Sequence, residues 1–238
     1  AAKTAACRVL VVDDQELNRL VAQQLLKQHG FDVRLASNGE SAIQAVSEQL
    51  PHAILMDLHM PEMDGIETTA RLRTMYSPER LPIIALTADV TEEQHQKCLA
   101  SGMNDVVTKP INPPALISAL SRWLQQEVDD VGVQPTPVAD VDQDSPYLQA
   151  AIALNRLSGK RQLYVQLLEK FDAQYSNVAQ QLQALISDPN LEPAIRLAHS
   201  LSGASGHLGA TVLQHAASAL EQALRNGQDG QSEWIQLE

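Results

Sequence analysis

The sequence predicts two domains of different fold class, an α/β domain followed by an all-α domain. Short β-branched runs alternate with helical patterns over the first 127 residues, which is typical of a parallel sheet with helices on both faces. After residue 146 no alternating strand pattern occurs, and apolar residues recur at helical spacing. An acidic, proline-containing stretch separates the two regions. We therefore expect one domain at 1–127, a linker at 128–146 and a second domain at 147–238.

The first domain is expected to contain five strands and five helices in alternation. The strands are expected at Arg8–Val12, Phe31–Ala36, Ala53–Met56, Ile83–Leu86 and Asp105–Thr108. The helices are expected at Glu16–Lys27, Gly39–Gln49, Ile66–Met75, Glu92–Ala100 and from Pro114 to about Glu127. This alternation predicts a parallel sheet between two layers of helices.

Polar side chains follow four of the five predicted strands. These residues are Asp13, Asp14, Asp57, Thr87 and Lys109. A parallel sheet brings all of its carboxyl ends to one edge, which is where open α/β sheets bind ligands. Three converging carboxylates repel each other unless they bind a cation, and oxygen-only ligands suit Mg²⁺.

The hydroxyl and the ammonium group at the same edge suit the oxygens of a phosphoryl group, whose transfer depends on positioning and charge neutralisation. We therefore predict that Asp57 is a nucleophile that accepts a phosphoryl group as an aspartyl-phosphate. One aspartate at a strand end is usually a helix cap or a turn former. Five suitable residues at the ends of predicted strands favour the phosphate site over that explanation.

The predicted linker at 128–146 differs in composition from both domains. It contains five aspartates, three prolines and no lysine or arginine. Such a segment buries too little apolar surface to order itself, and its like charges favour extension. We interpret it as a tether.

The second domain is expected to be an antiparallel helical bundle. Helices are expected at Leu148–Leu157, Gln162–Ile186, Glu192–His207 and Thr211–Asn226. The final residues 233–238 are expected to open one more helix, which the end of the chain interrupts.

One histidine of this domain lies on an unusual helix face. At about 100° per residue, His199 lies about 160° from the apolar stripe that contains Leu201 and Leu208, so we expect a solvent-facing imidazole. Gly203 and Gly206 share its side with Ser202, and each glycine costs about 1 kcal/mol in a helix interior. Close approach of another protein's backbone is one reason to keep them there. We expect His215 to be ordinary surface.

Composition excludes several classes of function. The net charge of −12 disfavours binding to nucleic acid or to an anionic membrane. Cys7 and Cys98 form no CxxC pattern, which argues against a disulfide framework or a thiolate metal site and fits a reducing, cytoplasmic compartment. No apolar run reaches the roughly 18 residues of a membrane span. We expect any membrane anchor, such as one in an inner membrane, to lie outside this sequence.

The first domain resembles the receiver domain of two-component response regulators. The resemblance covers residues 7–127 and rests on the motifs at residues 9–14, 55–65, 83–88 and 107–110. It implies a five-stranded, doubly wound fold in which Asp57 is phosphorylated. It further implies that Mg²⁺ is bound by Asp14, Asp57 and the backbone carbonyl of His59, with Asp13 helping through water, and that Thr87 and Lys109 contact the phosphoryl group. Val106 stands where receivers often have an aromatic switch residue, which favours a relay over a transcription switch.

The second domain is similar to histidine phosphotransfer domains. The similarity rests mainly on residues 197–210, with support from 163–171 and 220–224. It implies a four-helix bundle whose His199 exchanges phosphoryl groups with receiver aspartates. The family usually has a lysine three residues after the histidine, where this sequence has Ser202. A missing cation predicts slower transfer or a weaker partner contact.

This domain order resembles the C-terminal end of hybrid sensor histidine kinases. The resemblance implies that a kinase phosphohistidine phosphorylates Asp57, that Asp57 passes the group to His199, and that His199 passes it to a downstream response regulator. The sequence lacks the glycine-rich nucleotide boxes and the dimerising histidine helix of a kinase core. We therefore expect the donor to be the kinase core of the parent protein.

Two alternatives are a phosphatase of the aspartyl-phosphate type and an interaction module with idle phosphate sites. The phosphatase normally needs an acid two residues after its nucleophile, where this sequence has His59, or Gln15 if Asp13 were used. Steady turnover of a small phosphate ester would favour the phosphatase. Failure to bind beryllofluoride with Mg²⁺ would favour the interaction module.

Overall fold

The fold is taken from a computed structural model that describes residues 7–88, 91–124, 147–157 and 159–227. The chain divides into two compact units, 1–133 and 134–238. The predicted linker at 128–146 and the helix predicted at 233–238 lie outside the described residues.

The first unit is a five-stranded parallel sheet with the strand order β2-β1-β3-β4-β5. The strands are β1 (Arg8–Val12), β2 (Asp32–Ala36), β3 (Ala53–Asp57), β4 (Ile83–Thr87) and β5 (Asp105–Thr108). The helices are α1 (Glu16–Gln28), α2 (Gly39–Glu48), α3 (Gly65–Arg73), α4 (Glu92–Ala100) and α5 (Pro113–Leu124). The predicted fold class is confirmed, and within the described residues the predicted bounds agree with the observed ones to about two residues. Residues 125–127, the predicted end of the last helix, lie outside the described residues.

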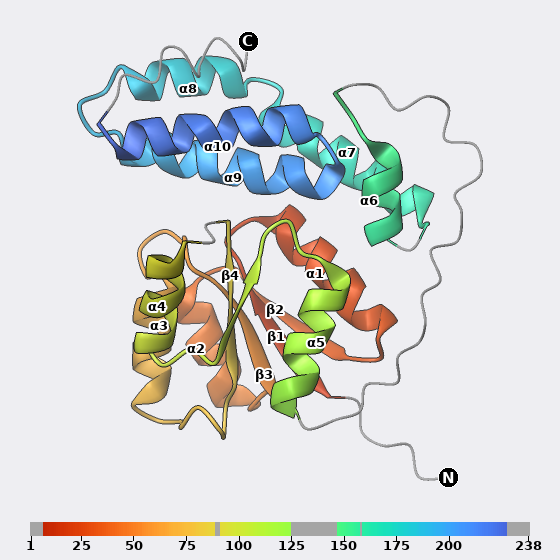
Figure 1. Cartoon of the computed structure of the whole chain (residues 1–238), viewed down its shortest axis with the longest axis vertical. Helices are drawn as coiled ribbons and strands as arrows, with labels where there is room; N and C mark the ends of the chain where they lie inside the picture. The colour runs from red at the N-terminus through yellow and green to blue at the C-terminus, as the bar shows by residue number, and fades with distance from the viewer. Residues whose placement is uncertain (1–6, 89–90, 125–146, 158, 228–238) are drawn as a thin grey trace. The chain divides into compact units, whose positions relative to one another are not determined.

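Alternate side chains of the central strands enter two separate cores, as the pleat of a strand requires. Val9, Val11 and Leu55 pack in the core that contains Leu25 and Leu120, which lie on α1 and α5. Leu10, Ile54 and Met56 pack in the other core with residues of α2, α3 and α4, including Ala42, Leu72 and Cys98. Figure 1 shows α1 and α5 on one face of the sheet and α2, α3 and α4 on the other. The central strands are therefore buried on both faces, which explains their continuous apolar sequence.

The strand register places the predicted site residues together. Val12 pairs with Met56, so Asp13 and Asp57 follow at the same level on neighbouring strands. Thr87 pairs with Thr108, so Lys109 follows at this edge as well. The edge is the carboxyl end of all five strands.

The second unit is all helical, as predicted. Its helices in the described residues are α6 (Ala150–Arg156), α7 (Arg161–Tyr175), α8 (Val178–Ile186), α9 (Glu192–Leu208) and α10 (Thr211–Arg225). Helix α9 packs along α10 and also contacts α6, α7 and α8 (Figure 1). Gly209 ends α9 in the left-handed conformation, at φ 79°, which a glycine adopts without steric cost.

The single helix predicted for Gln162–Ile186 is wrong. The helix ends at Tyr175, and a new one begins at Val178 after Ser176 and Asn177. Serine and asparagine side chains compete for backbone hydrogen bonds and therefore favour helix ends over helix interiors. The apolar spacing continues across this break, which is why the pattern alone did not reveal it. None of the helices in the described ranges is both long enough and apolar enough to cross a bilayer.

Candidate functional site

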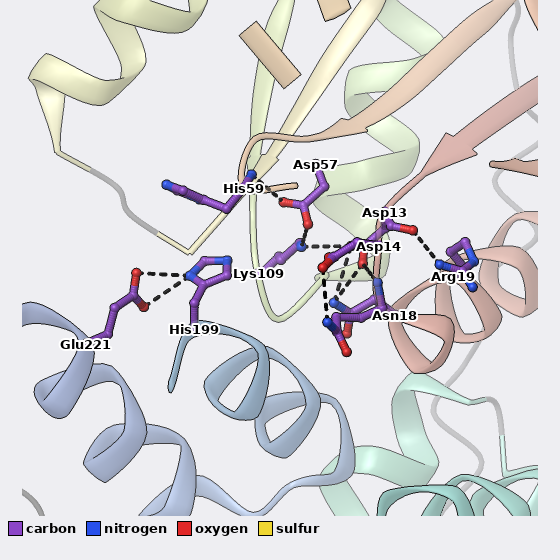
Figure 2. A network of polar contacts seen from close by, with 10 residues as sticks. Asp13, Asp14, Asn18, Arg19, Asp57, His59, Lys109, His199 and Glu221 are labelled. Carbon is purple, nitrogen blue, oxygen red and sulfur yellow. Dashed lines mark hydrogen bonds and ion pairs between the residues drawn. The ribbon is translucent and has the colours of Figure 1, made fainter. Parts of the chain in front are cut away.

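Asp13, Asp57 and Lys109 form a buried ionic cluster at the carboxyl edge of the sheet (Figure 2). The ammonium Nζ of Lys109 lies 2.8 Å from Oδ2 of Asp13 and 2.9 Å from Oδ2 of Asp57. Asp57 is the last residue of β3, Asp13 follows β1, and Lys109 follows β5. Three separate strand ends thus deliver two carboxylates to one cation.

Burial and mutual charge shift the protonation of this cluster. Burial raises the pKa of the Asp13 carboxyl above its ordinary value, and the charge of Asp57 raises it further, while Lys109 acts in the opposite direction. Burial lowers the pKa of Lys109, but the charges of Asp13 and Asp57 outweigh burial and raise its pKa overall. Lys109 is therefore a permanent cation, and one positive charge faces two carboxylates.

A third carboxylate makes the edge more acidic. Asp14 is half-buried, and carboxylate oxygens of Asp13, Asp14 and Asp57 lie within 4.8 Å of one another. These are hard oxygen donors in the number and spacing that a divalent cation accepts, so the donor set fits Mg²⁺. His59 lies two residues beyond Asp57, and its backbone N–H donates to Asp57 Oδ1 at 3.4 Å.

Thr87 reaches the same edge as the last residue of β4, and it is buried. Its backbone oxygen accepts a hydrogen bond from the Lys109 N–H at 2.7 Å, which ties the ends of β4 and the segment after β5 together. All five strand-end residues singled out in the sequence therefore lie at one edge of the sheet. Val106, in β5, is half-buried and packs against the core that includes Met56.

The turn after Asp57 depends on Gly65. A Cβ on Gly65 would lie 2.2 Å from the backbone oxygen of Asp57, well inside any permitted contact. The Gly65 N–H donates to the Leu58 oxygen at 3.0 Å, and Asp64 caps α3 by accepting from the Glu67 N–H at 2.7 Å. The motif at residues 64–65 thus folds the start of α3 back against the end of β3.

The residues that hold Asp13 from α1 were not identified from the sequence. Asn18 donates through Nδ2 to both carboxylate oxygens of Asp13 at 3.2 Å, and the Gln15 N–H donates to Oδ1 at 2.9 Å. The Arg19 guanidinium donates to the backbone oxygen of Asp13. The sequence feature that could have identified Asn18 is its position between Leu17 and Val21, on the side of the helix that faces the core.

In the second unit, His199 on α9 bonds to Glu221 on α10. Its Nδ1 lies 3.0 Å from Oε2 and 3.1 Å from Oε1 of Glu221 (Figure 2). Arg225, one turn further along α10, donates from Nε to Oε1 of Glu221 at 3.0 Å. Since an ionised carboxylate only accepts hydrogen bonds, Nδ1 is the donor in this contact, and in the neutral imidazole the lone pair therefore lies on Nε2.

Glu221 remains ionised despite its burial. Burial raises the pKa of the Glu221 carboxyl, but the hydrogen bond and charge of His199 and the charge of Arg225 outweigh burial and lower it below its ordinary value. The carboxylate therefore holds the imidazole in one tautomer and one orientation.

The prediction placed His199 on a helix face directed at solvent, and within the second unit its imidazole is bonded to Glu221 of α10. The apolar stripe marks one side of α9, but α9 contacts other helices of its unit over a wider arc that includes polar residues. Polar residues on that arc have partners on α10, which a search for apolar periodicity does not detect.

Two of the residues predicted to leave a bare surface beside His199 contact α10. Ser202 is buried and donates through Oγ to the Gln214 oxygen at 3.2 Å. A Cβ on Gly206 would lie 2.8 Å from the side-chain amide carbon of Gln214. Gly206 therefore permits close packing of α9 against α10. His215 is exposed, as predicted.

Comparison with known proteins gives two family matches. The response regulator receiver domain matches residues 9–121, and the Hpt domain matches residues 166–238. The resemblances inferred from the sequence motifs are confirmed.

Curated relatives match across both domains. The chain is 28% identical over 232 residues to the signal transduction histidine-protein kinase BarA of Escherichia coli, covering 93% of this chain and 24% of that protein. It is 30% identical over 235 residues to the sensor protein GacS of Pseudomonas syringae, covering 92% of this chain and 25% of that protein. The chain therefore spans about a quarter of the length of these two relatives.

A solved structure is similar to the first unit. The receiver domain of the sensor histidine kinase PA1611 from Pseudomonas aeruginosa is 35% identical, with a TM-score of 0.48, and the match covers 51% of this chain and all of that one. That structure is described with a magnesium ion coordinated in its active-site cleft.

Proposed function

Because the chain belongs to the response regulator receiver family and the Hpt domain family, in the order of the hybrid kinases it matches, we propose that it carries phosphoryl groups through a two-step relay. Asp57 accepts the group from a kinase phosphohistidine, and His199 takes it from Asp57. His199 then passes it to the receiver of a downstream response regulator. The convergence of Asp13, Asp14, Asp57 and Lys109 on one sheet edge carries this proposal.

In the first step an oxygen of Asp57 forms a bond to phosphorus while the bond from phosphorus to the donor nitrogen breaks. The electron pair of the broken bond stays on the donor imidazole. Lys109, 2.9 Å from Asp57 Oδ2, stays charged and offsets the negative charge that arrives with the phosphoryl group. Thr87 offers a hydroxyl at the same edge.

The residues that would hold Mg²⁺ are Asp13, Asp14, Asp57 and the backbone carbonyl of His59. A cation bound there would offset the negative charge of the carboxylates and of the phosphoryl group. Asp13 is held for this role by Asn18, Gln15 and Lys109, which fix both of its oxygens.

In the second step Nε2 of His199 forms a bond to phosphorus, and the bond to the Asp57 oxygen breaks and restores the carboxylate. Glu221 keeps the proton on Nδ1, so the lone pair on Nε2 is the nucleophile. The same carboxylate stabilises the positive charge that develops on the imidazole as the new bond forms.

The order of the relay is tested by label transfer. The chain is incubated with Mg²⁺ and a histidine kinase core carrying a labelled phosphoryl group, and Asp57→Ala is compared with His199→Gln. We expect Asp57→Ala to lose all label and His199→Gln to keep label only on the receiver. Label on His199 in the Asp57→Ala protein would contradict the proposed order.

A further inference from the structure

Asn18 lies in the first turn of α1, against the acidic edge. It is only 4% exposed, although it is a polar residue. Its Nδ2 donates to both oxygens of the Asp13 carboxylate at 3.2 Å. These two contacts satisfy the NH₂ group, which is the donor half of the side-chain amide.

The other half of the amide has no protein partner. The Oδ1 atom of Asn18 is buried, and no donor in the described part of the chain reaches it. A buried acceptor without a hydrogen bond costs about 1–3 kcal/mol. Rotating the amide by 180° would not remove this cost, because it would bring Oδ1 against the carboxylate of Asp13, which also only accepts hydrogen bonds. The unsatisfied oxygen thus belongs to an amide that is held against the Asp13 carboxylate.

We propose that Asn18 is a positioning residue for the hydrated divalent cation, and this inference rests on the Mg²⁺ site of the proposed function. Nδ2 orients Asp13, and Oδ1 accepts a hydrogen bond from a water molecule that the cation retains. Mg²⁺ dehydrates reluctantly and usually keeps several waters when a protein binds it. Such a water needs acceptors, and Oδ1 is a buried acceptor that needs a donor.

A purely structural role for Asn18 makes a different prediction. If Asn18 served only to fasten α1 to the end of β1, its loss would lower stability equally with and without Mg²⁺. If it receives a hydrogen bond from the hydrated cation, its loss also weakens cation binding. Replacing a residue that hydrogen-bonds to a metal ligand typically weakens metal affinity by about 10- to 100-fold.

The test uses the full chain with MgCl₂ alone, without any phosphoryl donor. Mg²⁺ affinity is measured by calorimetric titration, and the rise in melting temperature with Mg²⁺ is measured in parallel. Asn18→Leu removes both halves of the amide at similar volume, and we expect its Mg²⁺ Kd to rise by at least about 10-fold.

Asn104→Leu is the matched control. Asn104 is a structural asparagine of the same unit, which accepts from Ile83 N–H and Arg73 at 2.9 Å and lies before β5, at the opposite edge of the sheet. This variant is expected to melt at a lower temperature and to keep the wild-type Mg²⁺ affinity. An unchanged Kd in Asn18→Leu would overturn the inference.

Asn18→Asp separates the two halves of the amide. It keeps an oxygen acceptor in place of Oδ1 and loses the donor to Asp13. We expect Asn18→Asp to bind Mg²⁺ at least as tightly as wild type, while like-charge repulsion from Asp13 lowers its stability without Mg²⁺. If Asn18→Asp bound Mg²⁺ as weakly as Asn18→Leu does, Oδ1 would have no role in cation binding and the proposal would be rejected. Absence of Mg²⁺ binding by the wild type would instead contradict the metal site of the proposed function.

Discussion

The two proposed phosphoryl acceptors, Asp57 and His199, lie in opposite electrostatic surroundings. The neighbours of Asp57 are two further carboxyl groups and one lysine. His199 is bonded to a carboxylate that is itself paired with Arg225. The first site gathers more negative charge than its own cation offsets, whereas the second pairs its base with one anion and one cation.

This difference follows from the chemistry required of each residue. A carboxylate that receives a phosphoryl group accumulates negative charge, so its site must recruit positive charge. An imidazole that receives the group becomes positively charged, so its site needs a nearby anion and a fixed tautomer. The proposed direction of transfer, from Asp57 to His199, agrees with an acceptor whose surroundings stabilise positive charge.

Among the substitutions that test this difference between the two sites, Lys109→Ala is expected to have the largest effect. Removing the lysine leaves Asp13 and Asp57 without the cation that lies 2.8 and 2.9 Å from them. We expect the initial rate of Asp57 labelling to fall by about 100- to 1,000-fold, the usual cost of removing one preorganised electrostatic partner. Lys97→Ala, which removes an exposed ion pair with Glu93, is the control and should retain the wild-type rate. A rate within threefold of wild type in Lys109→Ala would contradict the electrostatic role.

A smaller effect is expected from Glu221→Ala. Loss of the hydrogen bond that Nδ1 donates to the charged Glu221 carboxylate frees the His199 ring to change tautomer, and we expect transfer from Asp57 to His199 to slow by roughly 10-fold. Label should then accumulate on Asp57, whose own labelling rate is unchanged. Nitrogen NMR of the His199 ring reports the tautomer directly.

Two variants control the Glu221 prediction. Glu221→Gln keeps an oxygen that accepts from Nδ1 but lacks the negative charge, so it should recover only part of the transfer rate. Glu192→Ala removes an exposed acid at the start of α9 and should have no effect. Equal rates in Glu221→Ala and wild type, with the tautomer unchanged, would reject the positioning role.

The same contrast explains which parts of the site were predictable. Asp13, Asp14, Asp57, Thr87 and Lys109 were found because strand ends of a parallel sheet share an edge, so position along the chain fixes position in space. Asn18 was missed because its role depends on the direction of one side chain at the start of α1.

The bundle was predictable in its helical content but less so in its contacts. Apolar spacing located α9 and α10 within a residue or so. It could not reveal Glu221 as the partner of His199, because 22 residues separate them and only the packing of two helices brings them together. The break at residues 176–177 was missed because apolar spacing carries no information about backbone capping.

One glycine in each unit allows the two units to be compared in stability as well. Gly65 faces the backbone of Asp57, which cannot move aside, so Gly65→Ala is expected to destabilise the receiver by about 1–3 kcal/mol. Gly206 faces the end of the flexible Gln214 side chain, and alanine gains about 1 kcal/mol in helix propensity. Gly206→Ala should therefore be close to neutral. The free energy of unfolding of each variant is measured by denaturant titration. A larger loss of stability in Gly206→Ala than in Gly65→Ala would contradict this account of α9 packing.

The smallest expected effect is the pH dependence contributed by Glu221. Burial raises its pKa, but His199 and Arg225 outweigh burial, so the folded-state pKa lies below the ordinary value of 4.5. The unfolded chain therefore takes up the proton first as the pH falls, and the stabilisation by Glu221 is present above pH 4.5 and lost below it. Unfolding free energies of wild type and Glu221→Gln should differ more at pH 5 than at pH 3. If the difference grew on acidification instead, Glu221 would be protonated in the folded bundle, and it could not hold the proton on Nδ1 of His199.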